Sequence, residues 1–127
     1  KISSFYETPS YPNKRFPKYF NVGLLAEYKF TYEDLFRKIN LIEKKMGRFR
    51  TKKNDPRTCD IDIIDFYGII KKKGSIILPH PRSHIRNFVL YPIKEIDPNW
   101  IHPKTNKSIK KLIFSLSIKD ITSIKHI

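Results

Sequence analysis

Two acidic residues at alternate positions, Asp60 and Asp62, are the part of the sequence best suited to chemistry. Successive side chains of a β-strand face opposite ways, so a strand would place both carboxylates on one face, about 6.6 Å apart, with Ile61 and Ile63 turned towards a core. Adjacent anions repel each other unless a cation lies beside them. Mg²⁺ suits such a pair because it takes one or two carboxylates and fills its other positions with phosphate oxygens and water. The spacing indicates a magnesium site, with Arg57 placed to bind a phosphate; the alternative is the solvent face of an edge strand.

Composition narrows the class of partner. The chain of 127 residues carries 26 Lys and Arg against 12 Asp and Glu, a formal net charge of +14. Such an excess favours an anionic partner, namely nucleic acid, a membrane surface or a phosphorylated small molecule. The lysines are scattered, and an AT-rich genome produces the same bias towards Ile, Lys and Asn, so nucleic acid is the less favoured partner.

The same composition predicts a single domain of residues 1–127, expected to be a cytoplasmic monomer. No apolar run is long enough to cross a membrane, and no signal peptide is visible. The single cysteine, Cys59, excludes an internal disulfide and fits a reducing compartment. Because the chain starts at Lys1, without Met and inside a β-prone stretch, we expect it to be truncated at its N-terminus.

The first half of the chain is predicted to contain two strands and a helix. Residues 2–8 and 19–30 are β-prone and flank a loop with two prolines, so they are expected to pair as neighbours. A helix is expected to begin at Thr31, with Asp34 as its capping partner, and to end at Gly47. Four apolar residues at helical spacing are predicted to face the core: Leu35, Ile39, Ile42 and Met46.

The second half adds the segment that carries the acidic pair. Residues 58–66 are predicted to be the central strand, and residues 75–78 to return as a short strand of a hairpin. Helical patterns follow at 83–95, broken near Pro92, and at 109–116. This order predicts an α+β fold with an antiparallel sheet covered by helices, and a further strand and helix at the N-terminus would make it ferredoxin-like.

Six short motifs occur in order along the chain: residues 3–9 (SSFYETP), 19–21 (YFN), 42–50, 56–63 (PRTCDIDI), 78–82 (LPHPR) and 86–90 (RNFVL). Together they resemble the 6-hydroxymethyl-7,8-dihydropterin pyrophosphokinase family of folate biosynthesis. Each motif alone is weak, but the combination is specific and covers most of the chain.

The resemblance implies a Mg²⁺-dependent transfer of pyrophosphate from ATP to the hydroxymethyl group of the pterin, with release of AMP. It implies that Asp60 and Asp62 hold two Mg²⁺ ions and that Arg50 and Arg57 join them in catalysis. The residues expected to bind ATP are Glu43, Arg50, Arg57, Ile63, His80 and Arg86. Those expected to bind the pterin are Thr8, Pro9, Tyr11, Tyr19, Asn21 and Phe88.

The chain departs from the family pattern in three places, one of which is Asn40, where the family commonly has a longer amide on the adenosine side. The N-terminal strand and helix of the family are absent, and the loop after Arg50 is one residue shorter and carries Lys52, Lys53 and Asn54 in place of a tryptophan and an arginine. Two alternatives stay open: a basic nucleic-acid-binding α+β module, and a non-catalytic fragment of a larger folate-pathway protein. Fusion to, or association with, another enzyme of that pathway is a related expectation.

Overall fold

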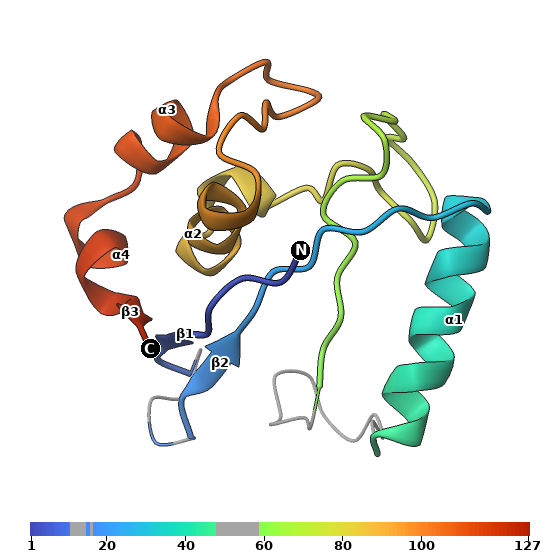
Figure 1. Cartoon of the computed structure of the whole chain (residues 1–127), viewed down its shortest axis with the longest axis horizontal. Helices are drawn as coiled ribbons and strands as arrows, with labels where there is room; N and C mark the ends of the chain where they lie inside the picture. Colours follow the sequence, from blue (N-terminus) through green and yellow to red (C-terminus); the bar gives the residue numbers. More distant parts are fainter. Residues whose placement is uncertain (11–14, 16, 48–58) are drawn as a thin grey trace.

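The small antiparallel sheet brings the start and the end of the chain together (Figure 1). The computed structural model describes residues 1–10, 15, 17–47 and 59–127. The strand order is β2-β1-β3, and both neighbours run antiparallel to β1. The strands are β1 (Tyr6–Thr8), β2 (Tyr19–Asn21) and β3 (Lys125–His126).

The predicted pairing of the first two strands is confirmed, but the strands are shorter than expected. Tyr6 lies opposite Asn21 and Thr8 opposite Tyr19. Beyond them only an isolated bridge, Ile2 to Leu24, continues the contact. The sequence did not predict β3, whose His126 pairs with Tyr6 on the other side of β1.

The first helix, α1 (Tyr32–Lys45), has the ends that were predicted. The Thr31 hydroxyl accepts a hydrogen bond from the backbone N–H of Asp34 at 3.1 Å, and Gly47 follows the C-cap with φ +85°. Its apolar stripe is only partly in the core. Ile39 is buried, whereas Ile42 and Met46 are 46% and 45% exposed.

The predicted central strand at 58–66 is wrong for its described part, residues 59–66. These residues are extended but make no strand ladder with any described segment. They run between the sheet and α1, in green in Figure 1, and are held by single contacts such as the backbone hydrogen bond from His80 N to Ile64 O at 2.8 Å. The hairpin that follows is reduced to one bridge between Lys71 and Leu78. A strand needs a partner alongside it, and local alternation alone does not supply one.

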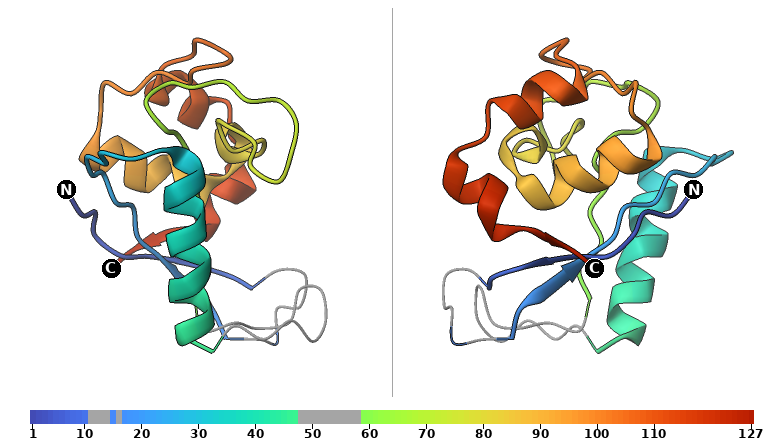
Figure 2. Two further views of the ribbon diagram at one scale, coloured as in Figure 1. Left: turned by 90° about the vertical axis from the view of Figure 1, so that its right-hand side faces the viewer. Right: turned by 60° about the vertical axis from the view of Figure 1, so that its left-hand side comes forward.

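The helices after this segment pack around α2, which lies between the sheet and α3 (Figures 1 and 2). The break in the helical pattern comes at Arg86, whose backbone is extended, rather than at Pro92, which stays inside α2 and packs against Gly23. The elements are the 3₁₀ helix η1 (Ser83–Ile85) and the helices α2 (Asn87–Ile96), α3 (Ile109–Phe114) and α4 (Ile118–Ser123).

Two apolar clusters hold these elements. Phe66, Ile76 and Leu78 form one beside α1, and Leu90, Ile109 and Leu112 form the other between α2 and α3. The architecture confirms an α+β fold with an antiparallel sheet and covering helices, and it is consistent with a ferredoxin-like domain. Within the part of the chain that the structure describes, no helix has the length and apolar character needed to cross a membrane.

Candidate active site

The acidic pair keeps its predicted alternation although the segment is not a strand. Asp60 and Asp62 are exposed, whereas Ile61 and Ile63 are half-buried, and Ile63 packs against the Phe66 cluster. The two carboxylates are therefore presented to solvent from a backbone that is anchored on its other side. That is the arrangement that a metal ion and a phosphate chain could approach.

Glu43 anchors this segment to α1. Its side chain is buried, 3% exposed, and its Oε2 accepts a hydrogen bond from the backbone N–H of Ile61 at 2.9 Å. Its burial excludes a solvated side chain, which is the ordinary state of a glutamate in the last turn of a surface helix. Because Ile61 lies between Asp60 and Asp62, this hydrogen bond helps to place both carboxylates.

A basic group lies next to Asp62. Burial lowers the pKa of His80, the cations of Arg86 and Arg82 lower it further, and Asp62 opposes them. Burial likewise lowers the pKa of Arg86, with Arg82 acting in the same direction and Asp62 raising it. The Asp62 carboxylate thus lies within electrostatic range of an imidazole and a guanidinium from a neighbouring segment.

His80 is oriented by the backbone that follows it. Its Nδ1 accepts a hydrogen bond from the N–H of Arg82 at 3.2 Å. In the neutral ring, favoured by the lowered pKa, the proton then lies on Nε2, which can donate to an anionic oxygen. His80 and Arg86 can together offer hydrogen-bond donors to phosphate oxygens.

A second group of predicted site residues gathers on the paired strands. The Asn21 amide nitrogen donates to Thr8 Oγ1 at 3.0 Å and to the Tyr6 carbonyl at 3.2 Å. Thr8 is buried, and Tyr19, opposite Thr8 in the register, is exposed. The Asn21 carbonyl oxygen and the Tyr19 ring are thus side by side on β2, as recognition of a flat, polar-edged ring requires.

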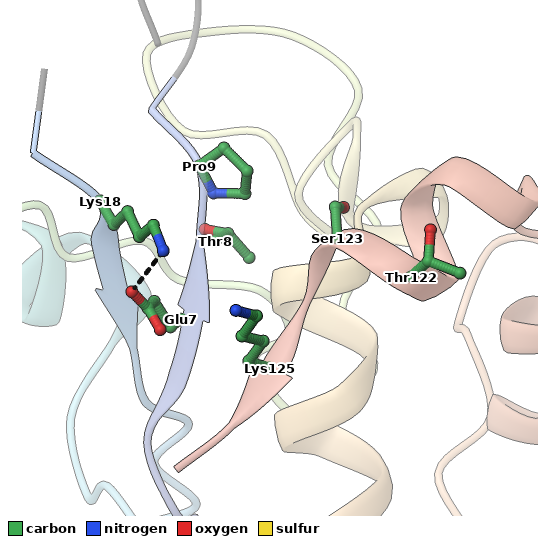
Figure 3. Close-up of a pocket in the computed structure, with 7 residues that line it drawn as sticks. All are labelled: Glu7, Thr8, Pro9, Lys18, Thr122, Ser123 and Lys125. Carbon is green, nitrogen blue, oxygen red and sulfur yellow. Dashed lines mark ion pairs between the residues drawn. The ribbon is translucent and has the colours of Figure 1, made fainter. Parts of the chain in front are cut away.

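A pocket of about 260 Å³ opens at the end of β1 (Figure 3). We name it the tail pocket, because β1 with Pro9 and Lys18 forms one side of it and the C-terminal tail forms the other. An ion pair between Lys18 and Glu7, at 3.2 Å, lies at its strand side. Its lining comprises Glu7, Thr8, Pro9, Lys18, Thr122, Ser123 and Lys125. It contains two predicted pterin-binding residues, Thr8 and Pro9.

Comparison with known proteins agrees with this geometry. Residues 1–98 match the model of the family described as 7,8-dihydro-6-hydroxymethylpterin-pyrophosphokinase (HPPK). The chain belongs to the HPPK family. The match takes in the Thr8–Asn21 pair, the acidic segment and the residues around His80 and Arg86, and it ends before α3.

Individual relatives carry the same description. A 2-amino-4-hydroxy-6-hydroxymethyldihydropteridine pyrophosphokinase of Synechocystis is 35% identical over 114 residues, which is 89% of this chain and 57% of the relative. The Aquifex aeolicus protein of that name is 34% identical over 111 residues, 87% of this chain and 69% of the relative. The folic acid synthesis protein fol1 of Pneumocystis carinii is 35% identical over 98% of this chain, but only 17% of that protein is covered. The chain thus spans little more than half the length of the Synechocystis relative.

Six of the fourteen site residues expected from the HPPK resemblance fall into two described groups. Asp62, His80 and Arg86 are brought together, and so are Thr8, Tyr19 and Asn21. Phe88 lies in the first turn of α2, where the guanidinium of Arg86 is 5.3 Å from its ring centre. Three expected residues, Tyr11, Arg50 and Arg57, lie outside the described residues.

The residues also fit the metal that HPPK chemistry implies. Among the described residues no group of three or more His, Cys, Asp and Glu side chains gathers into a metal site. Mg²⁺ does not need one when a phosphate chain supplies further oxygens, and two exposed carboxylates such as Asp60 and Asp62 then suffice. The donor set therefore suits a metal that arrives with a nucleotide.

Sequence reasoning missed the tail. Thr122, Ser123 and Lys125 line the tail pocket, yet they lie in a stretch whose local pattern was ambiguous and beyond the family match. A serine before a possible helix, at Ser117, was the available signal for α4, and its hydroxyl does accept from the N–H of Asp120 at 3.1 Å. No local signal predicts that α4 would return to β1.

Proposed function

We propose that the chain transfers pyrophosphate from ATP to the hydroxymethyl group of 6-hydroxymethyl-7,8-dihydropterin and releases AMP, as a step of folate biosynthesis. The observation that carries this proposal is the exposed acidic pair Asp60–Asp62 with Asp62 beside His80 and Arg86, in a member of the HPPK family. Carboxylates next to phosphate-binding cations form a site for a metal–nucleotide complex.

Asp60 and Asp62 hold two Mg²⁺ ions in this proposal, and Glu43 keeps their backbone in place through Ile61. When bound, the metal ions neutralise the phosphate oxygens and spread the charge that develops during transfer. His80 donates from Nε2, and Arg86 from its guanidinium, to phosphate oxygens. Arg50 and Arg57 are proposed to bind phosphates as well. Glu43 and Ile63 are proposed to lie next to the adenosine.

Thr8, Pro9, Tyr11, Tyr19, Asn21 and Phe88 are proposed to bind the pterin. The Asn21 amide nitrogen is already engaged with Thr8 and Tyr6, so its carbonyl oxygen is oriented and can accept from the pterin. Phe88 and Tyr19 supply aromatic faces for stacking. The chemistry then consists of positioning and electrostatic stabilisation, and no general base is assigned.

The deciding experiment measures AMP formation from ATP and Mg²⁺, with and without hydroxymethyl-dihydropterin. Asp60→Asn/Asp62→Asn is expected to abolish pterin-dependent AMP release because the metal ligands are removed. Glu33→Gln, which removes an exposed carboxylate in the first turn of α1, is the matched control and should retain full activity. Pterin-dependent AMP release that persists in the double variant, or its absence from folded wild-type protein, would contradict the proposal.

We also propose a cytoplasmic monomer. We further propose fusion to, or association with, another folate-pathway enzyme; the support is relatives such as the Pneumocystis carinii protein, of which this chain covers 17%. Light scattering on the purified chain tests the monomer directly. A stable dimer would contradict this part of the proposal without affecting the assignment of the reaction.

A further inference from the structure

Asn87 lies between two predicted site residues, Arg86 and Phe88, at the first position of α2. Its side chain is buried, with 8% of its surface exposed. Burying an amide costs free energy unless its polar atoms are hydrogen-bonded, so the partners of this side chain indicate its role.

Both ends of the Asn87 amide have partners. Oδ1 accepts from the backbone N–H of Phe88 at 2.7 Å. Nδ2 donates to the carbonyl oxygen of Asp120 at 2.6 Å and to Ser123 Oγ at 3.3 Å. One side chain therefore joins the first turn of α2 to α4, which lies 33 residues further along the chain.

The α4 end of this connection is a wall of the tail pocket. Ser123, which accepts from Asn87, lines the pocket across from Thr8 and Pro9 (Figure 3). A change in the distance between α2 and α4 would therefore change the width of the pocket. This wall comes from residues after 98, beyond the match to the family model.

At the α2 end of the connection, an aromatic ring and a cation lie against each other. The guanidinium of Arg86 lies 5.3 Å from the centre of the Phe88 ring, and the backbone of Phe88 is bonded to Asn87. Without the hydrogen bonds from Asn87 to α4, the first turn of α2 would be free to rotate. The ring proposed to stack on the pterin would then lose its fixed orientation.

We propose that Asn87 is a positioning residue for the pterin: by donating its amide hydrogens to α4, it sets the orientation of Phe88 and the width of the tail pocket. The inference rests on the proposed pyrophosphokinase function. Asn87 itself is buried, bonded to two backbone groups and the Ser123 hydroxyl, and acts through its neighbours.

The test uses the full chain with Asn87→Ser. The serine hydroxyl can still accept from the N–H of Phe88, but the shorter side chain cannot reach Asp120. Losing both hydrogen bonds from Asn87 to α4 is expected to raise KM for the pterin about five- to tenfold, with kcat changed less than about twofold. Asn87→Asp, which keeps the acceptor and the length but removes the donor, is a second variant and should raise KM in the same direction.

Glu95→Ala is the matched control. Glu95 lies at the other end of α2 and ties it to β1, accepting from Ser4 N at 2.6 Å and from the Tyr6 hydroxyl at 2.8 Å. The Glu95→Ala substitution should lower Tm without raising KM for the pterin. If the wild type is active and both Asn87 variants keep its KM for the pterin, the inference about Asn87 is overturned while the proposed function stands. Absence of pterin-dependent AMP release from the wild type would overturn the proposed function, and the inference with it.

Discussion

Single residues decide how the acidic segment is held, and Glu43 is the clearest of them. A sequence pattern places it next to an apolar stripe, in the last turns of a helix, where a solvated side chain is the ordinary expectation. The structure instead buries it and bonds it to the Ile61 N–H between the two carboxylates. A buried acidic side chain with a backbone partner is thus a positioning group for the proposed metal site.

Glu43→Ala is expected to lower the free energy of unfolding by about 1–3 kcal/mol, because the partly buried N–H of Ile61 loses its acceptor. Urea denaturation followed by circular dichroism measures the change. The exposed Glu33→Ala on the same helix serves as its control and should shift stability by no more than about 0.5 kcal/mol. If both substitutions changed the free energy of unfolding equally, the hydrogen bond from Ile61 to Glu43 would not contribute to stability.

At the scale of elements, packing between the sheet and α2 depends on Gly23. A Cβ built at this position would lie 2.8 Å from the Cβ of Pro92, which is inside α2 and has no freedom to withdraw. Gly23→Ala is therefore expected to destabilise the protein by about 1–3 kcal/mol through overpacking. Thermal unfolding measures it. A Tm equal to that of the wild type would mean that α2 shifts freely on the sheet.

The turn between α2 and α3 gives a prediction about pH. His102 is buried, its Nδ1 accepts from the N–H groups of Lys104 and Thr105, and its Nε2 has no partner within the described structure. Burial lowers its pKa, His84 and Lys104 lower it further, and Asp65 opposes them. The unfolded state then binds more protons than the folded state just below the usual histidine pKa of about 6.5.

The stability that neutral His102 contributes should therefore be fully present above about pH 6.5. The free energy of unfolding should fall as the pH drops through the lowered pKa of folded His102. Urea unfolding at a series of pH values measures this slope. His80 has a lowered pKa too and contributes in the same direction, so the comparison uses His102→Asn against His80→Asn. A slope that is unchanged in the His102 variant would contradict the assignment.

At the scale of the whole molecule, the formal charge of +14 should act on the nucleotide before any specific contact does. Long-range attraction of an anion is screened by salt, with a Debye length of about 10 Å at 0.1 M and about 3 Å at 1 M. We expect KM for MgATP to rise several-fold as ionic strength increases, with kcat little changed. Steady-state kinetics at constant pH tests this, and a KM that is independent of salt would contradict it.

Removing the metal ion tests the proposed binding of MgATP by a second measurement, thermal stability. A ligand that binds only the folded state raises Tm. MgATP should raise Tm more than ATP does with EDTA, and Asp60→Asn/Asp62→Asn should remove the difference, because these carboxylates are the proposed metal ligands. If the variant keeps the difference, the metal is held elsewhere.

Several features of this protein followed from the sequence because their causes are local. The Thr31 cap, the Gly47 end and the pairing of 2–8 with 19–30 depend on residues close together in the chain. The exposed Asp60 and Asp62 beside half-buried isoleucines follow from alternation in an extended backbone, which survives without a ladder. The motif resemblance likewise needed only short runs of residues, and the family match confirms it.

Other features were decided only by tertiary structure, because they join segments far apart in the chain. The pairing of β3 with β1, the hydrogen bond from Ile61 to Glu43 and the reach of Asn87 to α4 leave no periodic or local signal. The break at Arg86 instead of Pro92 belongs here too, since Pro92 stays helical where it packs on Gly23. Local pattern determines which groups a backbone can present, whereas long-range packing determines which of them meet.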